Sequence, residues 1–154
     1  MRITQRLLTT CLVLSIGAPL YGAGGIEKSI VLDDQAISQL EQRAEQANPR
    51  EQCFLYTELV SAMTEAAGKQ LMDGDTDRAS ATLKKVAKYA QLIHMNLARD
   101  TKRLKNAEML MHHTTYRLTE YLHRASSEDR PTLQATLKQL SQVQSELLTQ
   151  VFNH

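Results

Sequence analysis

Residues 76–125 decide the fold and read TDRASATLKKVAKYAQLIHMNLARDTKRLKNAEMLMHHTTYRLTEYLHRA. They contain neither proline nor glycine, and their apolar side chains recur at steps of three and four, which places them on one face of an α-helix. This spacing is typical of long antiparallel or coiled-coil packing, and it weakens only at Asp100 and Thr101. We therefore predict one helix of about 50 residues, about 75 Å long at ~1.5 Å per residue. The alternative is a kink within residues 98–101. The apolar positions are Ala79, Leu83, Val86, Ala90, Ile93, Leu97, Leu104, Ala107, Met111, Leu118, Tyr121 and Ala125.

Prolines and glycines mark the ends of three further helices around this stretch. We predict the first over residues 33–47, because the residue before Pro49 is pushed away from helical geometry. Pro49 suits the first turn of a second helix over residues 49–73, which ends at an Asp-Gly-Asp turn. The last helix is predicted over residues 130–152.

The predicted class is all-α: an elongated antiparallel helical bundle around the long helix, forming a single domain over residues 33–154. With no Trp and only two Phe, the core must be aliphatic and methionine-containing. By their lengths, the helices over 49–73 and 130–152 fold back along the long helix and meet end to end near its middle.

Charge is divided along the chain. Residues 24–75 contain 10 acidic and 4 basic side chains, whereas residues 76–125 contain 4 acidic and 10 basic ones. This complementarity favours docking of the amino-terminal helices on the long helix, although each exposed ion pair stabilises the fold by only ~0.2–1 kcal/mol.

The amino terminus resembles a secretory signal. Arg2 and Arg6 precede an apolar run over residues 7–20 and a small-residue zone over residues 22–25. The run is shorter than the ~20 residues that a membrane-spanning helix needs. An uncleaved amino-terminal anchor is the alternative to cleavage.

We therefore predict a signal peptide over residues 1–24, with cleavage near residues 23–25 and a flexible mature amino terminus over residues 25–32. The protein is then exported to the periplasm or the extracellular space and has no transmembrane span in its mature form. After cleavage, Cys53 is the one remaining cysteine, so no internal disulfide is expected. Cys53 is interpreted as a buried small hydrophobe, an intermolecular disulfide partner or a reactive thiol.

Methionine and histidine gather at one point of the long helix, at Met109, Met111, His112 and His113. Thioether and imidazole groups bind copper, nickel or zinc, so this segment is a weak candidate metal site. Against it, adjacent histidines on a helix point ~100° apart. Glu120 with His123 matches the Glu-x-x-His spacing of di-iron bundles, but the chain contains no second copy of it. No metal ligand and no cofactor is therefore predicted.

A basic cluster at the middle of the long helix comprises Arg99, Lys102, Arg103 and Lys105. Nucleic acid binding normally requires net positive charge and interleaved aromatic residues, so no nucleic acid partner is expected. A weak, salt-sensitive association with an anionic envelope surface is the remaining alternative.

Residues 60–90 resemble the middle of a tetratricopeptide repeat, a 34-residue helix-turn-helix unit. The resemblance rests on Ala67, on Ala79 and Leu83, and on the turn Gly74-Asp75-x-Asp77. Gln70 stands at the usual aromatic position, Val86 replaces a usual alanine, and no second copy follows. We interpret the segment as a generic helical hairpin, so the resemblance implies no ligand-binding residues.

The sequence contains no recognisable catalytic motif. We therefore expect a non-enzymatic exported protein that acts through protein–protein contacts or self-association, as an adaptor, envelope scaffold or chaperone-like helper. An apolar strip left uncovered on the long helix would attract such a partner. The alternative function is a metal sensor or buffer that uses the Met/His segment.

Overall fold

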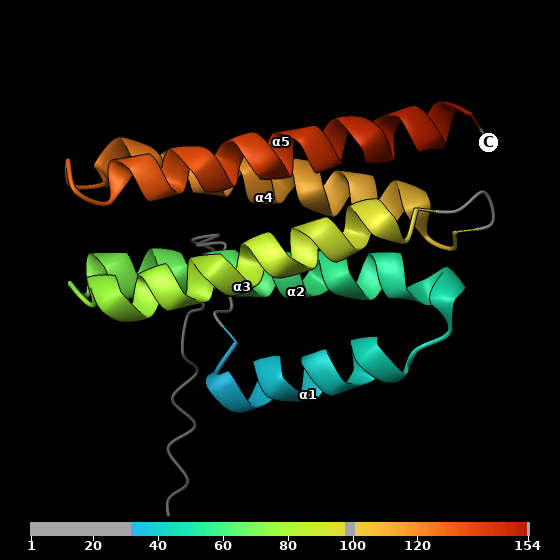
Figure 1. The fold of residues 1–154 in the computed structure, drawn as a ribbon, viewed down its shortest axis with the longest axis horizontal. Coiled ribbons are helices and arrows are strands. Elements are labelled where there is room, and N and C mark those ends of the chain that lie inside the picture. Colours follow the sequence, from blue (N-terminus) through green and yellow to red (C-terminus); the bar gives the residue numbers. More distant parts are fainter. Residues whose placement is uncertain (1–31, 98–100, 154) are drawn as a thin grey trace, which may run out of the picture.

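The chain forms a bundle of α-helices (Figure 1). The computed structural model describes residues 32–97 and 101–153; the predicted signal peptide and residues 25–31 lie outside the described residues. Within the described part all regular structure is helical, which confirms the all-α prediction. The helices are α1 (Asp34–Gln46), α2 (Pro49–Met72), α3 (Thr76–Met95), α4 (Leu104–Arg124) and α5 (Arg130–Phe152).

The predicted 50-residue helix is wrong. Its sequence forms two helices, because α3 ends at Met95 and α4 begins at Leu104. The break includes the point where the heptad weakens, but the chain reverses there instead of kinking (Figure 1). Asn96 closes α3 with its backbone amide on the Ile93 carbonyl and with its side-chain amide, 2.7 Å from the Leu92 carbonyl.

The reversal is anchored on the beginning of α2. The backbone amide of Lys102 donates to the Arg50 carbonyl at 2.8 Å, and the Lys102 ammonium lies 3.2 Å from Glu51. Arg103 takes a left-handed backbone conformation, with φ of 57°, and its guanidinium lies 3.6 Å from the centre of the Phe54 ring. These contacts hold the first turn of α4 beside the first turn of α2, which local helix propensity alone does not specify.

Four helices occupy the corners of a bundle. Helix α2 packs against α3 and α4, and α5 packs against the same two helices, so α2 and α5 stand at opposite corners. The expected end-to-end meeting of the second and last helices is therefore wrong: both run alongside α3 and α4 for most of their length (Figure 1). Helix α1 is a fifth element that packs on the outer side of α2.

The core is aliphatic, as the composition predicts. Methionine, alanine and branched side chains fill the space between the helices, and two buried threonines, Thr57 and Thr64, satisfy their hydroxyls on the carbonyls four residues earlier. None of the described helices is long and apolar enough to cross a membrane. The apolar side chains without exposed surface are Ala44, Cys53, Leu59, Val60, Val86, Ala90, Ile93, Ala107, Met111, Leu140 and Leu147.

Ion pairs join the acidic and basic parts of the chain, which confirms their predicted docking. Each of four pairs takes its carboxylate from α1 or α2 and its cation from the residues after Gly74. The Asp34–Arg78 and Glu51–Lys102 pairs are exposed on both sides, so each stabilises the fold by ~0.2–1 kcal/mol, whereas Glu41 and the Arg117–Glu65 pair are partly buried. The pairs are Asp34–Arg78, Glu41–Lys85, Glu51–Lys102 and Glu65–Arg117.

Candidate functional site: a furrow between α1, α2 and α4

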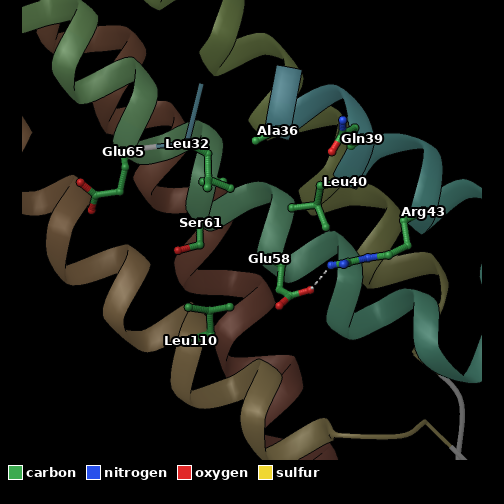
Figure 2. Close-up of a pocket in the computed structure, with 10 residues that line it drawn as sticks. Leu32, Ala36, Gln39, Leu40, Arg43, Glu58, Ser61, Glu65 and Leu110 are labelled. Carbon is green, nitrogen blue, oxygen red and sulfur yellow. Dashed lines mark hydrogen bonds and ion pairs between the residues drawn. The ribbon is translucent and has the colours of Figure 1, made fainter. Parts of the chain in front are cut away.

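The surface of α2 is open between α1 and α4, and this opening forms a hollow in the described part of the chain. Figure 2 shows it from outside, with Leu32 and Leu40 on one side and Leu110 of α4 on the other. Its volume is about 660 Å³. Half-buried Ser61 and Ala62 of α2 also line it. We call this hollow and its two extensions described below the furrow.

The furrow stays open because α1 is drawn toward α3. Ile37, Leu40 and Ala44 bury one face of α1 on α2. On the far side, the Tyr89 hydroxyl of α3 donates to Glu41 at 3.0 Å, and Lys85 lies 3.6 Å from the same carboxylate. In the described residues the α1 backbone therefore packs on α2 and not on α4.

Two further hollows continue the furrow along α2. Toward the beginning of α2, a hollow of about 600 Å³ is lined by Glu51, Leu55 and Arg103, and the Arg43–Glu58 ion pair at 3.2 Å separates it from the central one. Figure 2 shows this ion pair reaching across from α1. Toward the end of α2, a hollow of about 360 Å³ shares Leu32 with the centre. The three hollows are therefore neighbours along α2, divided by the Arg43–Glu58 ion pair on one side and by Leu32 on the other.

A partly buried polar network joins α2 and α4 next to the central hollow, which Glu65 also lines. Arg117 of α4 donates from Nε to Glu65 Oε1 at 2.8 Å, and it also pairs with Glu120. The Tyr121 hydroxyl donates to Glu65 Oε2 at 2.5 Å. The Tyr121 ring lies flat against Gly68 of α2, so close that a Cβ atom on Gly68 would stand 2.2 Å from it. The network therefore fixes the α2–α4 spacing and, with it, the width of the furrow.

Burial and hydrogen bonding shift the pKa values of Arg117 and Tyr121 in this network and of Tyr89 on α3. The hydrogen bond to Glu65 raises the pKa of Arg117 above its usual value. Burial, reinforced by the hydrogen bond to Glu65, raises the pKa of Tyr121 to about 12. Burial raises the pKa of Tyr89 as well, with a further contribution from its hydrogen bond to Glu41. Both phenols therefore stay neutral in the folded protein when they would ionise in the unfolded chain.

These shifts predict alkaline instability. Because the Tyr121 pKa is raised from 10.0 to about 12 on folding, its contribution to stability is complete below pH ~10 and is lost as the pH rises through the folded value. We expect the free energy of unfolding, from urea titrations at pH 9 to 12, to fall across this window. Tyr121→Phe should make the fall shallower, while the exposed Tyr116→Phe control should keep it. An equal fall in all three proteins would contradict the assignment.

The Met/His segment does not converge on one point. Met111 is fully buried in the core, whereas Met109 is 60% exposed and His113 points to solvent with it. His112 lies toward α5, where its Nδ1 is 2.8 Å from the Gln144 amide nitrogen. Within the described residues no group of three or more histidine, cysteine or acidic side chains is arranged to hold a metal ion. Met109 shares a face with His112 at i+3 and with His113 at i+4, but His112 contacts Gln144 of α5.

The other candidate site residues from the sequence do not come together in one site either. Cys53 has no exposed surface, and burial raises the pKa of its thiol to about 12. This agrees with a small core hydrophobe and leaves the folded chain no sulfur surface for an intermolecular bridge. Glu120 pairs with Arg117, while His123 is exposed. Of the basic cluster, Lys102 and Arg103 are directed to Glu51 and Phe54 of α2, and Arg99 lies outside the described residues.

The furrow is not apparent from the helical periodicity of the sequence, although the distribution of apolar residues around α2 indicates that this helix has neighbours on several sides. Its apolar residues surround the helix instead of forming one stripe: Leu59 and Met63 enter the core, while Leu55 and Ala62 are half-buried on the furrow side. A helix that is apolar on several sides has neighbours on several sides. Comparisons with known protein families, curated proteins and solved structures find no match to this chain.

Proposed function

We propose that this chain is a non-enzymatic, exported helical-bundle protein that acts through protein–protein contacts, as an adaptor, envelope scaffold or chaperone-like helper. The furrow carries this proposal. Leu32, Leu40, Ala62 and Leu110 give it an apolar lining between the walls formed by α1 and α4, and α4 carries two further exposed apolar side chains, Met109 and Tyr116. Exposed apolar surface of this kind is typical of interaction sites.

One sequence feature supports the exported setting of this function. The charged and apolar pattern over residues 1–24 resembles that of a signal peptide. A partner in the cell envelope or outside the cell is therefore the expected occupant of the furrow.

A photo-crosslinking amino acid placed at Ser61, on the furrow floor, tests the proposal in the native envelope. We expect a discrete adduct from Ser61 and none from the matched position Ser141, which is exposed on α5. Leu110→Glu, which places a charge in the furrow wall, should remove the Ser61 adduct while leaving the helical circular dichroism unchanged. Absence of a Ser61 adduct, or identical adducts from both positions, would overturn the proposal.

A further inference from the structure

The shape of the furrow selects a helix as its occupant. Its floor and walls are helices, whose backbone groups are already hydrogen-bonded, so an extended strand would find no sheet edge to pair with. A helix satisfies its own backbone and needs only an apolar face. Ala36, Ser61 and Ala62 are small, which leaves room at the centre of the furrow for a helix at the ~8–10 Å axis separation of packed pairs. From Glu58, where the ion pair with Arg43 closes the central hollow, to Asp73, α2 extends ~22 Å at ~1.5 Å per residue, which is the length of a helix of about 15 residues.

The charge of the furrow is uneven along its length. At the end near Leu32, the lining contains four aspartates and two cations. At the opposite end, two acidic and two basic side chains balance each other. Of the four aspartates, Asp34 pairs with Arg78 and Asp73 lies 2.6 Å from Lys69. The furrow is therefore acidic at one end and neutral at the other.

The other two aspartates give the acidic end its excess negative charge. Asp33 accepts the Ala36 amide at 2.8 Å, and Asp75 accepts the Arg78 amide at 3.2 Å, so both cap helices. Neither has a cation within 4 Å among the described residues. An ionised carboxylate that accepts one backbone amide has further lone pairs that can accept hydrogen bonds from a partner.

Resting on the proposed function, we propose that the furrow binds an amphipathic helix of a partner protein whose apolar face lies against Leu40, Ala62 and Leu110 and whose cationic end lies among Asp33, Asp34, Asp73 and Asp75. The apolar side chains of the central hollow supply the affinity, and the acidic end fixes the direction in which the helix lies. Complementary charge of this kind also raises the association rate and makes it sensitive to salt.

The test uses the purified protein and two fluorescent 18-residue peptides. Both carry leucine and alanine at i, i+3, i+4 and i+7; one ends in three lysines and the other in three glutamates. Anisotropy titrations at low salt should show the lysine peptide binding about tenfold more tightly, a difference of 1.4 kcal/mol. The difference should shrink as salt rises, because exposed charges are screened.

Matched variants locate the effect. Asp34→Asn with Asp73→Asn should bring the two peptides to within about threefold of each other, whereas Asp77→Asn, an exposed first-turn acid of α3 that does not line the furrow, should preserve the preference. Leu110→Glu should weaken binding of both peptides. Circular dichroism confirms that each variant remains helical.

The outcomes separate this inference from the proposed function. If both peptides bind equally well and Leu110→Glu abolishes their binding, the proposed cationic end of the occupant is wrong. The furrow then remains a contact surface. Failure of both peptides to bind, with a Ser61 adduct still formed in the envelope, overturns the helical occupant. Concentration-dependent dimers in sedimentation that are blocked by Leu110→Glu would assign the furrow to a second copy of this chain and overturn the inference.

Discussion

Gly68→Ala is expected to lower the free energy of unfolding by about 2 kcal/mol, the usual size of an overpacked core. In a solvated helix the same change would stabilise the protein by about 1 kcal/mol, because alanine is the better helix former. Here the added methyl group would stand 2.2 Å from the Tyr121 ring. The ring cannot yield without breaking its hydrogen bonds to Glu65 and Arg117. Urea denaturation followed by circular dichroism measures the loss.

A double-mutant cycle separates this clash from other causes. In a Tyr121→Ala background the ring is gone, so Gly68→Ala should become neutral or stabilising. An equal loss in both backgrounds would show that something other than the Gly68–Tyr121 contact sets the α2–α4 spacing. The variant should also weaken binding at the furrow, because Glu65 lines the furrow and belongs to the displaced network.

Arg117→Met is expected to cost about 2–3 kcal/mol of the free energy of unfolding, somewhat less than the full value for breaking a buried ion pair. The substitution keeps most of the apolar stem but leaves Glu65, whose side chain is only 14% exposed, without its cation. The loss comes from a poorly solvated carboxylate that has lost its counter-ion, although the Tyr121 hydroxyl still donates to it. Thermal and urea unfolding of the purified variant measure it.

Arg43→Met is the matched control, since Arg43 also joins a glutamate of α2 across the furrow. Its side chain is 64% exposed, so the loss should stay below about 1 kcal/mol. Replacing both partners, as in Glu65→Leu with Arg117→Leu, should recover much of the stability, because no buried charge is then left unpaired. If Arg43→Met and Arg117→Met cost the same, burial does not decide the strength of these pairs.

Local signals predicted the three shorter helices closely. Pro49 and the capping residue before it open α2, and the side chain of Asn48 accepts the Arg50 amide at 3.0 Å. Gly74 closes the α2–α3 hairpin with a φ of 80°. In each case the residue that sets the boundary lies within a few positions of it, so the sequence pattern is sufficient.

The long-helix prediction failed for a physical reason that lies outside the stretch itself. Residues 76–125 contain no breaker, and a heptad stripe is compatible with one helix or with two that face the same core. The reversal depends on Lys102 and Arg103 reaching Arg50, Glu51 and Phe54, about fifty positions earlier in the chain. Such contacts form only when α2 is already alongside.

The sequence by itself therefore determined that this chain is helical, where most of its helices begin and end, that its core is aliphatic, and that its acidic and basic parts pair. Periodicity, capping and net charge are local or additive properties, so the order of residues carries them. Tertiary structure alone decided that residues 76–125 form two antiparallel helices instead of one long helix. They form the two opposite corners α3 and α4, and the apolar stripes of both helices face the same core. The same reversal places α4 beside α2 and creates the furrow, whose lining comes from three helices that no sequence window contains together.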